Sequence, residues 1–199
     1  MDDFSIETHP FAPVLPPRAR VMMMGTFPPA AAKRCMAFHY PNFQNDMWRI
    51  YGLVFFNDAG HFQVAGEKRF DAGKIRDFLM AHNIALCPTV RRAVRERGNA
   101  SDKFLRIVEP VDLGAVLAQL PDCRWLFTTG GKATETLLSL LEPAPPMPPV
   151  NQAVAFDYHG RHLQLCRLPS SSRAYPLALA AKAAAYRAFF ERSGVLPLS

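Results

Sequence analysis

Residues 21–29 read Val-Met-Met-Met-Gly-Thr-Phe-Pro-Pro, a continuous apolar run that passes directly into a turn. The run predicts a strand over residues 20–24. Gly25 permits a positive φ and a close backbone approach to a ligand, while Pro28 and Pro29 prevent a helix from starting at once. In open α/β sheets, ligands bind beyond the carboxyl ends of the strands. The segment therefore predicts one wall of a ligand site, with an ordinary tight loop as the alternative.

Strands and helices alternate along the rest of the chain. We expect further strands over residues 84–87, 125–128, 154–158 and 163–167, and helices over residues 45–55, 71–82, 112–120, 132–141 and 176–192. This alternation favours a parallel sheet covered by helices. We predict an α/β fold, a three-layer α/β/α sandwich whose central, mostly parallel sheet has about four to five strands.

The composition suits one globular domain. The chain has 199 residues, of which 49% are hydrophobic, so a single well-buried domain over residues 1–199 is expected. A net charge of +6 and a pI near 9.4 attract polyanions and favour DNA as a partner without establishing it. Asp2 and Asp3 stand where a secretory signal has positive charge, and no apolar run approaches the roughly 18 residues of a membrane span. We expect a monomeric cytoplasmic protein with no membrane association.

Several classes of site are poorly supported. The four cysteines occur singly and are Cys35, Cys87, Cys123 and Cys166. Because they form no Cys-x-x-Cys pair and have no His at ligand spacing, no metal site is expected. The chain also lacks Gly-x-x-x-x-Gly-Lys and Gly-x-Gly-x-x-Gly, which argues against nucleotide hydrolysis and dinucleotide binding. We therefore expect no cofactor.

A second informative segment, residues 38–49, alternates aromatic and amide side chains before a helix. Amides can donate and accept hydrogen bonds together at one base edge, and aromatic rings stack on a base taken out of the duplex. Asn45 has an alternative role as a helix N-cap, and Trp48 is better explained as a core residue. His39, Tyr40 and Asn42 remain open as ligand contacts.

A third segment, residues 168–173, reads Leu-Pro-Ser-Ser-Ser-Arg after an apolar run. The small hydroxyls and backbone N–H groups of Ser170, Ser171 and Ser172 would let a DNA strand approach closely. Arg173 would add charge, and its planar group could fill the gap left by an extruded base. The alternative is a polar turn in which Ser172 caps the last helix.

Two other basic segments are weaker candidates for DNA contact. One consists of Arg91, Arg92, Arg95 and Arg97. The commoner explanation for such a run is the solvated face of a helix, and the more specific one is a patch that faces DNA. The other is Gly130-Gly131-Lys132, where glycine followed by a helix start could meet an anion. Lys132 is accordingly a candidate DNA-binding residue.

In order and spacing, the three segments resemble the uracil-DNA glycosylase superfamily. The resemblance is carried by Gly-Thr-Phe-Pro-Pro at residues 25–29, Tyr-Pro-Asn-x-x-Asn-x-Met-Trp at residues 40–48, and Leu-Pro-Ser-Ser-Ser at residues 168–172. The middle segment is similar to the His-Pro-x-Asn-x-Phe-Trp stretch of the mismatch-specific and hypoxanthine-acting branches. Residues 98–103 also look typical of bacterial relatives.

The resemblance implies a DNA glycosylase that flips a deaminated base, uracil or hypoxanthine, from DNA and hydrolyses its N-glycosidic bond. The chain departs from the pattern at Phe27, where the uracil-specific branch has a water-holding Asp or Asn, and at Leu168, where several branches have a His. By motif position, Asn45 then takes the catalytic role, with Asn42 as its nearest substitute. The resemblance and the expected geometry together imply base contacts from Gly25, Thr26, Phe27, Pro28, His39 and Tyr40. They imply DNA contacts from Ser170, Ser171, Ser172 and Arg173.

The two departures from the superfamily pattern also favour another function. Because Phe27 and Leu168 remove two polar groups, a protein of the same fold that binds DNA or a nucleotide without cleaving it is the main alternative. Pro88 stands at a strand end where relatives often carry a polar residue. Some branches hold an iron–sulfur cluster through four cysteines, two of them closely spaced, and this chain has no such pair. A small-molecule hydrolase with a Ser nucleophile is less supported because no Gly-x-Ser-x-Gly elbow is present.

Overall fold

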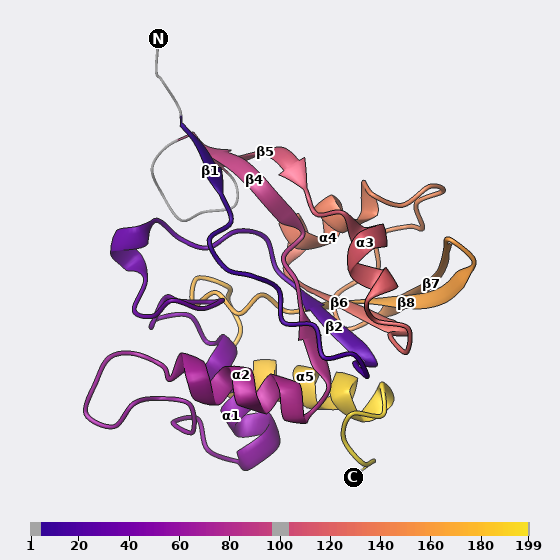
Figure 1. Ribbon diagram of the computed structural model, residues 1–199. Helices are drawn as coiled ribbons and strands as arrows, with labels where there is room; N and C mark the ends of the chain where they lie inside the picture. Colours follow the sequence, from indigo (N-terminus) through magenta and orange to yellow (C-terminus); the bar gives the residue numbers. More distant parts are fainter. Residues whose placement is uncertain (1–4, 97–103, 199) are drawn as a thin grey trace.

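The chain forms two β-sheets of different size (Figure 1). The computed structural model describes residues 5–96 and 104–198. The larger sheet has the order β3-β2-β6-β8-β7. Its strands are β2 (Val21–Met24), β3 (Ile84–Leu86), β6 (Trp125–Thr129), β7 (Ala153–Tyr158) and β8 (Arg161–Leu168). These are the strands that the sequence predicts, so the expected mostly parallel central sheet is confirmed.

Most strands of the larger sheet run parallel. β2 pairs in parallel with both β3 and β6, and β6 pairs in parallel with β8. Only β7 is antiparallel, as the second half of a hairpin with β8. The carboxyl ends of four strands therefore meet at one edge, which brings together the turns that follow Met24, Leu86, Thr129 and Leu168.

Helices cover both faces of this sheet. They are α1 (Met47–Phe56), α2 (Ala72–Ala81), α3 (Leu113–Ala118), α4 (Gly131–Leu138) and α5 (Leu179–Arg192). Val21 and Met23 belong to the core with α1, α2 and α5, whereas Met22 and Met24 belong to the core with α3 and α4. None of these four residues has exposed surface. The apolar run of β2 is thus covered on both faces, and the three-layer α/β/α architecture is confirmed.

The helix boundaries follow local hydrogen bonding. Asp71 and Asp112 each accept a backbone N–H of the first turn at 2.9 Å, so α2 and α3 begin directly after a polar cap. α5 begins later than the predicted residue 176, because residues 172–177 form turns closed by backbone hydrogen bonds. A short 3-10 helix, η1 (Ala31–Lys33), follows the prolines after β2. In the two described ranges, no helix has the length and apolarity needed to cross a membrane.

A second, three-stranded sheet is present that the sequence did not predict. Its order is β1-β4-β5, and its strands are β1 (Ile6–Thr8), β4 (Val90–Arg95) and β5 (Leu105–Pro110), all antiparallel. The pairing of β4 with β5 shifts register twice, between Val90 and Arg92 and between Arg92 and Ala93. Such irregularities interrupt the two-residue alternation by which a strand is recognised.

The basic stretch at residues 91–95 therefore lies on a strand, and the expected helix face is wrong. Arg91 and Arg92 reach the same carboxylate, that of Glu109, at 3.1 and 3.6 Å. Arg95 is largely buried, and its guanidinium bonds the carboxylate of Glu7 and the carbonyl of Pro28. These arginines are thus paired within the small sheet. Arg97 and residues 98–103 lie outside the described residues.

Candidate functional site

A pocket of about 460 Å³ lies beyond the carboxyl ends of the parallel strands. Its lining comes mainly from the three informative segments, residues 25–29, 39–45 and 170–174, together with His9. The predicted site residues that line it are Gly25, Thr26, Phe27, Pro28, His39, Tyr40, Asn42, Asn45, Ser170, Ser171 and Ser172. Leu86, Pro88 and Thr129 complete the strand-end side. Arg173 and Lys132 are not among the lining residues.

Gly25 makes room for Tyr40. A Cβ at Gly25 would collide with the Tyr40 hydroxyl, which in turn bonds the hydroxyl of Thr129 at 2.7 Å. Gly25 does not use the positive φ that glycine permits; the site uses the absence of a side chain rather than unusual backbone geometry. The Gly25 carbonyl also accepts two hydrogen bonds from Thr89. Four segments of the chain, those of Gly25, Tyr40, Thr89 and Thr129, therefore meet at this point.

Phe27 forms an apolar wall in place of a polar group. Its ring meets the ring of His9 edge-on, with centroids 5.4 Å apart, and it packs against the core of the small sheet. The ring centroid of His9 in turn lies 5.3 Å from that of His39. The missed small sheet therefore contributes to the pocket, because β1 delivers His9 to it.

His39 and His9 are neutral parts of this wall. The pKa of each is lowered to about 4, mainly by burial, and for His9 the neighbouring His39 is a second cause. The Nε2 atom of His39 donates to the carbonyl of Ala12 at 2.9 Å. At neutral pH both rings are therefore uncharged, and the N–H of His39 is already engaged by the backbone carbonyl of Ala12.

Asn42 and Asn45 both face the pocket and both fix their own turns. Asn42 Oδ1 accepts the N–H of Gln44, and Asn45 Oδ1 accepts the N–H of Met47, each at 2.9 Å. Because a backbone N–H needs an acceptor, these bonds orient the amides and leave the Nδ2 groups as donors. Asn45 thus has both roles considered for it at once: it supports the start of α1 and lines the pocket.

Trp48 belongs to the core, as the sequence favours. It has no exposed surface, and its indole N–H donates to the carbonyl of His39 at 3.0 Å. That bond holds the segment before α1 in place and contributes to positioning Tyr40, which has a positive φ of 51°.

The serine loop, residues 170–172, uses its hydroxyls to shape itself. Ser170 Oγ accepts the N–H of Ser172 at 3.2 Å, and Ser172 Oγ accepts the N–H of Ala174 at 3.3 Å. Ser172 does not cap α5, whose N-cap is Ala178. The loop is therefore a turn held by its own hydroxyl groups, without the helix cap that the alternative interpretation included, and it lines the pocket.

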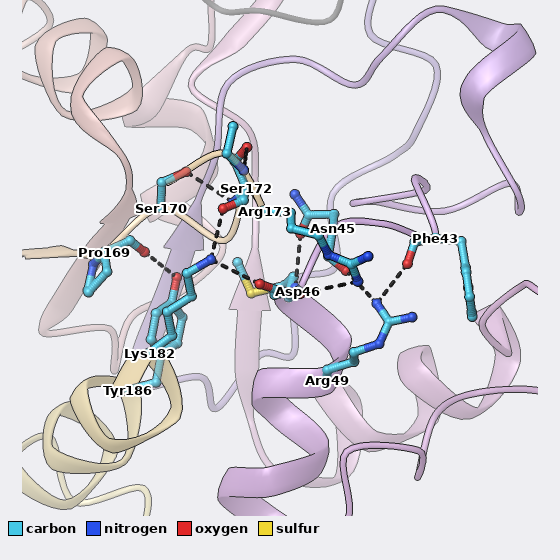
Figure 2. A network of polar contacts seen from close by, with 12 residues as sticks. Phe43, Asn45, Asp46, Arg49, Pro169, Ser170, Ser172, Arg173, Lys182 and Tyr186 are labelled. Atoms are coloured by element: carbon cyan, nitrogen blue, oxygen red, sulfur yellow. Dashed lines mark hydrogen bonds and ion pairs between the residues drawn. The ribbon is translucent and has the colours of Figure 1, made fainter. Parts of the chain in front are cut away.

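A buried ion pair fixes the serine loop to two helices (Figure 2). Lys182 of α5 is 1% exposed, and its Nζ donates to Asp46 Oδ2 at 2.9 Å and to the Ser172 carbonyl at 2.8 Å. The Asp46 N–H donates to the Ser171 carbonyl, and the Tyr186 hydroxyl donates to the Pro169 carbonyl. Sequence reasoning missed Lys182, because a lysine in an Ala-rich helix looks like a surface residue.

The remaining DNA-binding candidates lie around the rim or farther away. Arg173 is exposed, with Nη2 3.7 Å from Asp46 Oδ1. Gly130 has a φ of 119° and approaches the side chain of Ser170, so the serine covers the turn before α4. Lys132 follows on α4, outside the pocket lining.

The cysteines are dispersed. Burial raises the pKa of Cys87 to about 12 and those of Cys123 and Cys166 to about 11, which keeps these thiols protonated at neutral pH. Over the described part of the chain, no three His, Cys, Asp or Glu side chains are grouped as metal ligands.

The fold is similar to that of a solved structure. The solution NMR structure of a candidate uracil DNA glycosylase from Methanosarcina acetivorans matches with a TM-score of 0.65 and 21% identity, covering 96% of this chain and 99% of that one. At this identity the likeness shows the fold alone. No family model matches the chain, and no curated protein matches it.

Gly25→Ala should push Tyr40 out of place and break its bond to Thr129. We expect a loss of about 1–3 kcal/mol in the free energy of unfolding, measured by urea denaturation. In a Tyr40→Phe background, which lacks the colliding hydroxyl, the same change should cost less. Equal costs in both backgrounds would show that Tyr40 is not what requires a glycine.

Lys182→Met keeps the apolar stem but leaves Asp46 buried without its main partner. We expect a loss of about 3–5 kcal/mol, and the double variant with Asp46→Asn should recover part of it. Lys74→Met is the matched control, since Lys74 is exposed, and should change stability by less than about 1 kcal/mol. Equal effects of the two lysine changes would argue against a structural role for the pair.

Acid should destabilise the protein through the histidine wall. The folded-state pKa values of His9 and His39 near 4 lie below the ordinary value of 6.5, so between these pH values the unfolded chain binds more protons. The stabilisation is complete above about pH 6.5 and is lost as pH falls toward 4. His39→Gln should remove on the order of 2–3 kcal/mol of this pH dependence, as thermal melts of the variant and the wild type across the range would show. An unchanged pH dependence in His39→Gln would contradict this role of the buried ring.

Proposed function

We propose that this chain is a DNA glycosylase-like base-excision protein, which receives a deaminated base, uracil or hypoxanthine, from DNA and hydrolyses its N-glycosidic bond. The observation that carries the proposal is the convergence of three distant segments on one pocket of about 460 Å³. These segments also carry the resemblance to the uracil-DNA glycosylase superfamily, and the fold is like that of a candidate member. In this proposal the protein acts on DNA as a single-domain monomer, without metal or cofactor.

The chemistry requires a flipped base, stabilisation of the negative charge that grows on it, and a positioned water. Phe27 offers an apolar surface for the base, and Tyr40 and Gly25 form the adjoining wall. The departing base would accept hydrogen bonds from the Nδ2 groups of Asn45 and Asn42, whose oxygens are engaged with backbone N–H groups. We favour base contact over water activation for Asn45, because its oxygen already supports α1.

The described lining of the pocket bears on both candidate functions, because it offers neutral donors rather than a carboxylate. Among the residues that the structure describes, those lining the pocket include no Asp or Glu, and both lining histidines are neutral. A glycosylase of this kind would depend on preoriented neutral donors rather than on a carboxylate base. The same observation favours the second candidate, a non-catalytic protein that binds DNA or a nucleotide in this pocket.

The test is incubation with oligonucleotides carrying uracil, hypoxanthine, xanthine or mismatched thymine, followed by alkali to break the strand at any abasic site. We expect strand breaks with uracil or hypoxanthine. Tight, strongly salt-dependent binding without any released base would instead support the non-catalytic alternative. No strand break with any of the four substrates contradicts the enzymatic proposal.

Asn45→Asp separates the two roles of Asn45. The carboxylate still accepts the Met47 N–H and suits a helix start, so stability should hold, but the Nδ2 donor is lost and a negative charge faces the departing base. We expect the rate of base release to fall by about 100- to 1000-fold. Asn151→Asp, in an exposed turn before β7, is the control and should leave the rate unchanged. An unimpaired Asn45→Asp would confine Asn45 to its structural role.

A further inference from the structure

Two arginines stand beside Asp46 at the edge of the pocket (Figure 2). Arg49, on α1, donates to the carbonyl of Asn45, a pocket residue, at 3.1 Å. Arg173 lies between Ser172 and Ala174, which both line the pocket. Residues 49 and 173, far apart in the sequence, thus place two guanidinium groups on the same rim.

The charge at this rim is unbalanced. Asp46 is the carboxylate that Lys182 contacts at 2.9 Å and Arg173 at 3.7 Å. Among the described residues, Arg49 has no carboxylate within 4 Å. Arg49 and Arg173 lie close enough for Arg173 to lower the pKa of Arg49, after the larger effect of burial. One carboxylate therefore faces three cations, and the buried Lys182 takes the shortest contact with it.

Arg49 is held in a fixed orientation. Its Nη1 donates to the carbonyls of Phe43 and Asn45, at 2.7 and 3.1 Å. Its guanidinium carbon lies 4.5 Å from the ring centroid of Phe43 and 5.1 Å from that of Phe70. These contacts leave Nε and Nη2 as donors for an outside acceptor. A planar group fixed in this way loses little conformational freedom on binding, which suits recognition of a phosphate.

We propose that Arg49 and Arg173 form a phosphate-binding pair that grips the DNA backbone beside the nucleotide in the pocket. The inference rests on the proposed function for the identity of the strand, and it adds Arg49 as a residue that binds the backbone. A phosphodiester supplies the negative charge that the rim lacks, and its oxygens match the remaining donors of the two guanidinium groups. Arg173 then acts through its charge rather than by filling the gap in the duplex.

The test measures how the affinity for an undamaged, fluorescein-labelled duplex falls between about 50 and 300 mM salt, by fluorescence anisotropy. Each lost phosphate contact should reduce the slope of log K against log salt by about 0.9, so Arg49→Gln and Arg173→Gln should each show this loss and the double variant about twice as much. Arg49→Lys keeps the charge and should keep the slope.

Arg124→Gln is the matched control. Arg124 donates to two backbone carbonyls, as Arg49 does, but it lies just before the amino end of β6, at the opposite edge of the sheet. Its slope should equal that of the wild type. A wild-type slope in Arg49→Gln or Arg173→Gln, an equal loss in Arg124→Gln, or no measurable binding by the wild type would each overturn the proposal.

A second measurement follows the binding of DNA by the wild-type protein itself. The Nε–H resonances of Arg49 and Arg173 should shift when DNA is added, whereas that of Arg124 should not; Arg49→Lys, Arg173→Gln and Arg124→Gln assign the three signals. Unmoved Arg49 and Arg173 signals in the presence of bound DNA would also overturn the proposal.

The outcomes separate this inference from the proposed function. Reduced slopes without base release from any substrate would support the arginine pair and contradict the enzymatic activity. Base release with unchanged salt slopes would support the enzymatic activity and contradict the arginine pair. Calorimetry compares Arg49→Gln and Arg173→Gln with the wild type. If these variants lose as much affinity for deoxyinosine monophosphate as for DNA, the arginines bind the phosphate of a mononucleotide, and the DNA-backbone assignment is overturned.

Discussion

The pocket depends on one buried ion pair, that of Lys182 and Asp46. Lys182 extends from α5 to Asp46 at the start of α1 and also donates to the Ser172 carbonyl. One ammonium group thus joins α5, the start of α1 and the serine loop. Burying such a pair is costly in itself, and its strength as a stabiliser is limited. Its value here is geometric, because it fixes where the serine loop stands relative to Asn45.

The parallel core was predictable because its signal is local. β2 is a continuous apolar run, β3 is short and apolar, and the strands of the large sheet are each followed by a turn or loop. Parallel strands align their carboxyl ends, so the two segments that follow β2 and β8 were expected to share one crevice, and residues of both line the described pocket. Residue types and strand ends sufficed for this part of the site.

The parts that sequence reasoning missed depend on contacts between distant residues. The irregular pairing of β4 and β5 removes the alternation that marks a strand, so the small sheet and its contribution of His9 had no local signal. Lys182 likewise looks ordinary among alanines until Asp46 is placed opposite it. Gly25 was singled out for its backbone freedom, whereas the structure needs the absence of a Cβ there, because a Cβ would collide with the Tyr40 hydroxyl.

The long separation of Asp46 and Lys182 has a consequence for how the pocket assembles. The two residues are 136 positions apart, and closing so long a loop is entropically expensive until the intervening sheet has already shortened it. We therefore expect the ion pair to close only once the strands have paired and α5 has packed its aromatic residues onto the sheet, so that the serine loop is anchored after the core has formed. Ligand-binding competence would then be acquired last during folding, as a late step distinct from collapse of the core.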